Sequence, residues 1–322
     1  MMVLSLLFAA LAATAPTPTE YPVKTADFRV RDPFVVLDGG TYHLICAEPW
    51  FGGKGVNVLK SRDLENWTEP REVMKVPEKL GCSAVWAPEV HKYRGRWYLF
   101  VTLTLPEDAW PIKPMQIGNK RLGKLRPRGT WIFVADTLDG PFLPIRDGSV
   151  TPKEGMGLDG TLVVEDGKPY MVFCHEWCQV GDGRMMLAEL SEDLTTIVGE
   201  PKELFRASSY GRGNITDGCF VYRSEVSGKL YMLWSNWGFG SYATFLKESE
   251  SGRIAGPWKN AASLYENDGG HGMLFRKTDG SLNLAIHQPN RGKTERMMVL
   301  PVDDDGRILL TPCAKPVADV RN

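Results

Sequence analysis

The feature that most constrains the fold is a short pattern that occurs five times along the chain. In each copy an apolar strand begins beside a polar residue, reaches a tight turn and is followed by a second strand. The polar residues at the five starts are Asp32, Glu89, Asp159, Asp217 and His271, at intervals of roughly 55 to 70 residues. Such repeats are typical of propellers with four-stranded blades. We therefore expect an all-β fold, a five-bladed β-propeller.

The first copy shows the pattern most clearly. The apolar run 34–37 ends at Asp38-Gly39-Gly40, a hairpin turn signal, and 41–46 has the composition of the returning strand. No segment has sustained helical periodicity. A β-sandwich is the alternative all-β fold, but it does not explain why the same hairpin recurs with a polar residue at its start.

The N-terminal residues and the net charge suggest where the protein acts. The chain opens with an apolar run that is too short to span a bilayer, and small residues and a Pro/Thr-rich stretch follow it. This pattern predicts a signal peptide over 1–15, a single catalytic propeller over 16–322, and a secreted or periplasmic protein. The net charge of −1 gives no bulk attraction for nucleic acid or a membrane surface. Nothing in the sequence indicates an oligomeric state.

The cysteines do not suggest a metal or redox motif, because no two of them have C-x-x-C spacing. We expect buried thiols, although an exported protein could form one disulfide. The six are Cys46, Cys82, Cys174, Cys178, Cys219 and Cys313.

A hairpin returns to the end from which it started, so the ends of the second strands should lie on the same face as the five starts. That face then carries carboxylates, histidines and aromatic rings, the side chains that carbohydrate sites need for proton transfer and for stacking on sugars. The residues added in this way are Glu48, His175, Glu176, Trp177, Asn236 and His287, and Trp86 lies beside the second start.

A long segment, 105–130, interrupts the second repeat and leaves from the same face. It is basic, and loops of this length in compact domains are often functional. It is either a lid that shapes the pocket or a solvated excursion. Its cationic residues are Lys113, Lys120, Arg121, Lys124, Arg126 and Arg128.

The motifs at the repeat starts resemble those of glycoside hydrolase family 43, the five-bladed propeller enzymes that act on arabinose- and xylose-containing glycans. The resemblance is carried by Arg31-Asp32-Pro33, Trp86-Ala87-Pro88-Glu89, Leu158-Asp159-Gly160, and Gly270-His271-Gly272 with the later His287, and it covers nearly all of the mature chain. It implies that Asp32 is the general base and that Asp159 orients the general acid and raises its pKa. A structural calcium ion or a water could lie near His271, and no cofactor is required.

The fourth motif departs from the family pattern, because Asp217 stands where the family has Glu. The general acid is therefore either Asp217, by position, or Glu176, by chemistry and hairpin geometry, and Asp217 could instead bind sugar hydroxyls. The predicted catalytic residues are Asp32, Asp159, Asp217 and Glu176. The predicted substrate-binding residues are Glu48, Trp86, Glu89, His175, Trp177, Asn236, His271 and His287.

The resemblance implies an inverting hydrolase whose partner is an oligosaccharide or polysaccharide. An exo-acting α-L-arabinofuranosidase is the first expectation, with β-xylosidase, galactofuranosidase and endo-arabinanase as alternatives. A propeller that binds carbohydrate without hydrolysing it is the alternative class.

Overall fold

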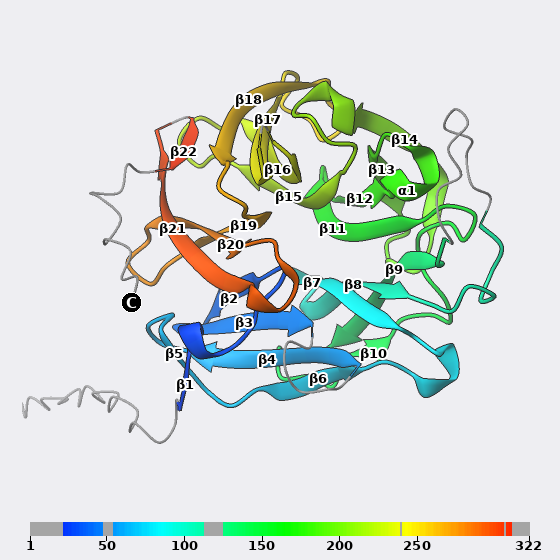
Figure 1. Cartoon of the computed structure of the whole chain (residues 1–322), viewed down its shortest axis with the longest axis horizontal. Coiled ribbons are helices and arrows are strands. Elements are labelled where there is room, and N and C mark those ends of the chain that lie inside the picture. The colour runs from blue at the N-terminus through cyan, green and yellow to red at the C-terminus, as the bar shows by residue number, and fades with distance from the viewer. Residues whose placement is uncertain (1–21, 48–53, 113–124, 239, 306, 311–322) are drawn as a thin grey trace, which may run out of the picture.

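The computed structural model describes residues 22–47, 54–112, 125–238, 240–305 and 307–310, and its sheets are arranged in a ring (Figure 1). The predicted signal peptide 1–15, Glu48, Cys313 and the segment 113–124 of the basic loop lie outside the described residues. Within the described part of the chain, no helix is long and apolar enough to cross a membrane.

The ring consists of five blades, each built on four antiparallel strands. The first is a six-stranded sheet, because the short strands β1 (Val23–Lys24) and β5 (Asn66–Trp67) extend it. The second and third are joined by one parallel pair, Gly129 with Gly157, into an eight-stranded sheet. The blade strands are β2 (Phe34–Asp38), β3 (Thr41–Ala47), β4 (Gly55–Ser61) and β6 (Arg71–Lys75); β7 (Ala84–Tyr93), β8 (Arg96–Thr104), β9 (Arg128–Ala135) and β10 (Leu143–Pro144); β11 (Gly157–Glu165), β12 (Lys168–His175), β13 (Arg184–Leu190) and β14 (Ile197–Arg206); β15 (Asp217–Arg223), β16 (Leu230–Trp237), β17 (Tyr242–Ser249) and β18 (Trp258–Tyr265); and β19 (Gly270–Arg276), β20 (Leu282–Gln288), β21 (Arg296–Asp304) and β22 (Ile308–Leu310).

The innermost strands are β2, β7, β11, β15 and β19, and they surround the middle of the ring (Figure 1). Each of them is the first strand of a predicted hairpin, so the predicted all-β propeller is confirmed. The turn at Gly39 and Gly40 shows why the sequence signal was reliable. Both glycines have positive φ, 56° and 76°, which is the backbone that a tight two-residue hairpin needs.

The helices are short and lie between strands. They are α1 (Trp177–Val180), η1 (Thr25–Asp27), η2 (Glu78–Leu80), η3 (Ala207–Ser209) and η4 (Gly292–Thr294). The core lies between the faces of neighbouring blades, where Trp67 and Trp234 are among the largest fully buried side chains. Burial of this apolar surface holds the blades together and fixes the inner strands that carry the site.

The described cysteines are free thiols. Cys46, Cys82, Cys174 and Cys219 are buried, as expected for small apolar side chains, and Cys178 is half-buried.

Candidate active site

Just before or within the first few residues of each inner strand, one residue lies in the left-handed backbone region, and these five residues are structurally equivalent. Their φ angles are 52° at Asp32, 46° at Ala87, 51° at Asp159, 53° at Gly218 and 52° at His271. In the last four strands the pairing register shifts at this point, which marks a β-bulge. Bulges redirect side chains and occur often beside active sites. Three of the five positions direct a titratable side chain to the centre of the face.

This equivalence corrects the predicted alignment of the second and fourth repeats. The bulge residues there are Ala87 and Gly218, so neither Glu89 nor Asp217 is the counterpart of Asp32. Asp217 directly precedes the left-handed Gly218, as Arg31 directly precedes Asp32 in the first blade. The sequence prediction aligned the polar residues of the five repeats, whereas the equivalent positions are those with a left-handed backbone. An alanine such as Ala87 gives no sequence signal for that conformation.

The four predicted catalytic carboxyls line one cavity of about 190 Å³ at the centre of this face. Two predicted aromatic residues, Trp86 and Trp177, also line it. Its complete lining is Arg31, Asp32, Trp86, Thr102, Arg128, Leu158, Asp159, Glu176, Trp177, Asp217 and His271.

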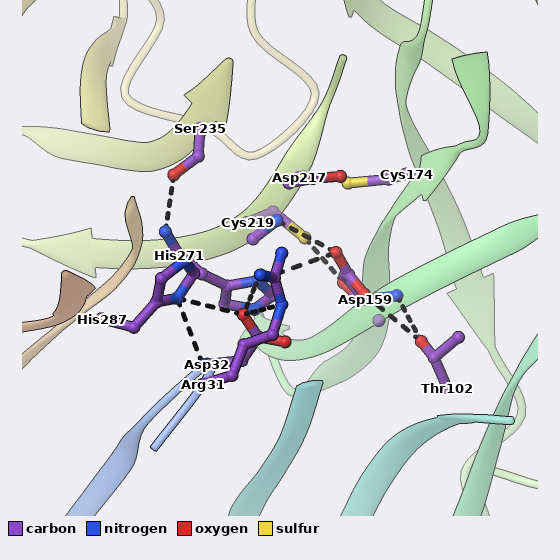
Figure 2. Close-up of polar contacts among 12 residues, drawn as sticks. Arg31, Asp32, Thr102, Asp159, Cys174, Asp217, Cys219, Ser235, His271 and His287 are labelled. Carbon is purple, nitrogen blue, oxygen red and sulfur yellow. Dashed lines mark hydrogen bonds and ion pairs between the residues drawn. The ribbon is translucent and has the colours of Figure 1, made fainter. Parts of the chain in front are cut away.

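Asp32 is held as a carboxylate by three cationic or ionisable neighbours (Figure 2). Its Oδ1 lies 3.2 Å from Nδ1 of His271, 3.3 Å from Nδ1 of His287 and 3.6 Å from Nε of Arg31. Burial favours the neutral acid, but His271, Arg31 and His287 outweigh it and hold the pKa of Asp32 well below its usual range. All three contacts reach Oδ1, and Asp32 lines the cavity.

Asp159 is placed by the strands on either side of it. Its backbone N–H donates to Oγ1 of Thr102 at 2.8 Å, and its Oδ2 accepts from the backbone N–H of Gly218 at 3.2 Å (Figure 2). Burial raises the pKa of Asp159 to about 6; His271 opposes this shift, while Asp32 and Glu176 add to it. Asp159 therefore lies between the base candidate and the acid candidate and interacts with both.

Asp217 has the properties of a proton donor. Burial raises its pKa to about 7, and the negative charges of Asp159 and Glu176 add to the shift. Its Oδ2 accepts a hydrogen bond of 2.9 Å from the Tyr242 hydroxyl, which fixes the carboxyl at the cavity wall. A carboxyl group that is still protonated near neutral pH is what a general acid requires.

Glu176 lies in the same cavity but in an ion pair. Its Oε2 is 2.5 Å from Nη1 of Arg128, and the carboxylate is buried. Arg128 thus engages one oxygen of the Glu176 carboxylate, whereas Asp217 is held by the neutral Tyr242 hydroxyl.

His271 connects the base to Asp159. Its backbone N–H donates to Oγ of Ser235 at 2.7 Å, and its Nδ1 is 3.9 Å from Oδ2 of Asp159 in addition to the shorter Asp32 contact. Burial lowers the pKa of His271, but Asp32, Asp159 and Glu89 outweigh it and the net pKa is raised. A protonated His271 would then bridge two carboxyl groups.

Nε2 of His271 is buried without a hydrogen-bond partner, at the place where the sequence leads us to expect a calcium ion or a water. Calcium prefers oxygen ligands, and waters would have to supply most of them here. Among the described residues, no group of three His, Cys, Asp or Glu side chains could hold a metal ion. A single buried ring nitrogen suits a water molecule better.

Four predicted substrate-binding residues do not line the cavity. Glu89 is buried with its Oε2 3.1 Å from Nε2 of His91, and Nε2 of His175 is 3.0 Å from Oε1 of Gln179. His287 is fully buried beside Asp32, and its ring stacks on the ring of Tyr242 with the two centroids 5.8 Å apart. These side chains share the correct face, but their strands turn them away from the cavity.

Asn236 is the fourth of these residues, and both ends of its side-chain amide are hydrogen-bonded to backbone groups. Its Nδ2 donates to the carbonyls of Ala207, Tyr210 and Gly213, and its Oδ1 accepts from Ile215 and Trp237. The side chain is fully buried. Successive strand residues point to opposite faces, and the hairpin rule alone does not decide which one faces the ligand.

Four lining residues and one supporting residue were not predicted as site residues. Arg31, Thr102 and Leu158 belong to motifs or strand ends that the sequence identified, and Arg128 belongs to the basic segment. Arg31 and Leu158 directly precede the predicted Asp32 and Asp159, and Thr102 and Arg128 lie at strand ends. These positions are the signal that could have found them. Tyr242 starts β17, and nothing in the sequence distinguishes it from the core tyrosines.

A larger cavity of about 440 Å³ lies elsewhere, beside Leu80, Leu105, Trp110 and Trp131. It shares no lining residue with the carboxyl cavity. The clustered ionisable groups, rather than cavity size, identify the candidate active site.

Comparison with known proteins agrees with the fold and shows the family. The model of glycosyl hydrolases family 43 matches residues 21–308. The endo-arabinase from Bacteroides thetaiotaomicron VPI-5482 is similar in structure with a TM-score of 0.74 and 32% identity, over 88% of this chain and 97% of that chain. The chain therefore belongs to glycosyl hydrolases family 43, and the predicted enzyme class, a glycoside hydrolase, is confirmed.

Two further similarities are less extensive or show the fold alone. The extracellular endo-α-(1→5)-L-arabinanase 1 of Bacillus subtilis (strain 168) is 26% identical over 106 residues, 30% of this chain and 32% of the relative. The matched segment thus spans about a third of that curated relative. The α-L-arabinofuranosidase from Lactobacillus brevis has a TM-score of 0.67 at 17% identity, over 87% of this chain and 93% of that chain.

Proposed function

We propose that the protein is an inverting hydrolase of α-L-arabinofuranosyl linkages and that it cleaves within α-1,5-linked arabinan chains. The observation that carries the chemistry is the opposite pKa shift of two carboxyls in one cavity, lowered at Asp32 and raised at Asp217. The relatives described as an endo-arabinase and an endo-arabinanase support the choice of substrate and of internal cleavage.

In the proposed mechanism, Asp32 is the general base. Its carboxylate takes a proton from a water that attacks the anomeric carbon, and His271, His287 and Arg31 keep that carboxylate charged beforehand. Asp217 gives its proton to the glycosidic oxygen as the bond to the leaving group breaks. Asp159 and the Arg128-paired Glu176 keep Asp217 protonated by repelling its negative charge.

The proposed chemistry uses carboxyl groups and water, so we expect it to require no cofactor. The buried Nε2 of His271 would bond to a water rather than to calcium. The substrate partner is an arabinose-containing oligosaccharide or polysaccharide. The apolar N-terminal run and the extracellular curated relative support secretion.

An exo-acting α-L-arabinofuranosidase is the second candidate. The cavity of about 190 Å³ favours it, because a small cavity suits a single terminal sugar. Both candidates use the same carboxyls and differ in the number of sugars bound beside the cavity.

The products formed from linear α-1,5-arabinan distinguish these candidates. We expect a mixture of arabino-oligosaccharides early in the reaction, whereas arabinose alone would support the exo-acting enzyme. Aryl β-xyloside and aryl galactofuranoside test the remaining family specificities. Absence of turnover on all of them by a folded protein would contradict hydrolysis, as would full turnover by Asp32→Asn.

A further inference from the structure

Trp237 ends β16 with 41% of its surface exposed, which is unusual for a tryptophan in this protein. Among the described tryptophans, only Trp86, at 36%, is otherwise classed as exposed, and Trp86 lines the carboxyl cavity. Trp237 does not line that cavity. A single exposed apolar residue is normal, but an aromatic ring on the ligand face is the kind of side chain that contacts ligands.

The backbone places Trp237 next to the acid candidate. Asp217 pairs with Ser235 across β15 and β16, and Trp237 is two residues beyond Ser235 on the same side of the strand. With a rise of about 3.3 Å per residue, it lies roughly 7 Å further toward the rim. Its ring contacts Tyr242 edge-on, with centroids 6.0 Å apart, and Tyr242 donates to Asp217.

The backbone that carries the ring is also well anchored, which lowers the cost of ordering a binding surface. The backbone N–H of Trp237 donates to Oδ1 of the buried Asn236 at 2.8 Å, and its carbonyl accepts from Arg212 at 3.0 Å. The same Asn236 amide fixes the neighbouring loop at Ala207 and Gly213. The strand end that carries the ring is thus fixed, and Tyr242 packs against one edge of the ring.

From this geometry we infer that Trp237 binds a sugar unit of the leaving group by stacking on its C–H face. The inference rests on the proposed function. A general acid must contact the glycosidic oxygen, which belongs to the leaving group, so that part of the substrate extends from Asp217. Trp237 is the exposed aromatic residue beyond Asp217 on the same blade. The ligand is therefore a pentose unit one or more positions past the cleaved bond.

The test measures kcat/KM on α-1,5-arabino-oligosaccharides of increasing length. For the wild type we expect kcat/KM to rise as sugars are added on the leaving-group side. Trp237→Ala should lower it roughly tenfold on the longest chains and leave the shortest cleaved substrate unchanged. Trp237→Phe should restore most of the loss. With chains labelled at the reducing end, the alanine variant should shift the cleavage position.

Val226→Ala is the matched control, because Val226 is 65% exposed on the turn at the opposite end of the same blade. It should match the wild type at every chain length. An equal loss at all lengths by Trp237→Ala would indicate a purely structural role and overturn the inference. An unchanged length dependence together with a changed oligomeric state would overturn it in favour of a contact with a second copy. Failure of the wild type to cleave any chain would instead contradict the proposed function.

Discussion

At the scale of single residues, the proton donor is the most informative position. Asp217 must be protonated to act, and its pKa is raised to about 7, so activity should fall as the pH rises through about 7. The pKa of Asp159 is also raised, to about 6. The two carboxyls interact, so the pKa measured from the pH profile belongs to the pair rather than to either residue. We expect Asp217→Asn to remove this alkaline limb from the profile of kcat/KM against pH.

The leaving group tests the same residue independently. Asp217→Asn should lower kcat by roughly 10²- to 10⁴-fold on a glycoside with a poor leaving group, and much less on one with a good leaving group. Glu176→Gln is the matched comparison, because Glu176 lies in the same cavity but is paired with Arg128. It should show little dependence on the leaving group. The reverse result would assign the acid to Glu176.

At the scale of elements, the left-handed residue at the head of each inner strand shapes the site, and Gly218 is the one of the five that has no side chain. A Cβ at Gly218 would lie 2.7 Å from Cγ of His271, and its φ of 53° already disfavours any side chain. Gly218→Ala should therefore displace His271 from Asp32 and cost about 1–3 kcal/mol of stability. Chemical denaturation and kcat should both report the change.

Gly228→Ala is the control for that substitution. Gly228 has a similar φ of 69° at the far end of the same blade, and a Cβ there would meet nothing within 4 Å. It should cost only about 1 kcal/mol, the penalty for the left-handed backbone, with kcat unchanged. Equal kcat values for the two variants would show that the packing of His271 against Gly218 is unimportant.

The same strand heads show how far the sequence could predict the molecule. The hairpins were predictable, because turn residues such as Gly39 and Gly40 and the apolar runs around them are local signals. Asp32, Asp159 and His271 were predicted at equivalent positions, and they are equivalent. The bulge at Ala87 was not predictable, because tertiary packing imposes a left-handed backbone on a residue that does not favour it. Which side of β16 Asn236 faces depends on the same packing.

At the scale of the whole molecule, the ring closes between the first and fifth blades around Glu295. This fully buried carboxylate precedes β21, and its two oxygens contact Nε of Arg29 at 2.5 Å and Nη1 of Arg31 at 2.8 Å. Its carbonyl accepts from the N–H of Val30 at 3.1 Å. Since Arg31 is also 3.6 Å from Asp32, closure of the ring and the charge on the base depend on one ion-pair network.

Glu295→Ala should therefore destabilise the protein and impair the base together. Removing one partner of a buried ion pair costs about 3–5 kcal/mol, because the remaining charges lose their compensation. Glu189→Ala is the control, since its pair with Lys168 is exposed and is expected to contribute less than about 1 kcal/mol. Thermal unfolding should show a loss of several degrees for Glu295→Ala and almost none for Glu189→Ala. If both variants unfolded at the wild-type temperature, the Arg29–Glu295–Arg31 network would not be what closes the ring.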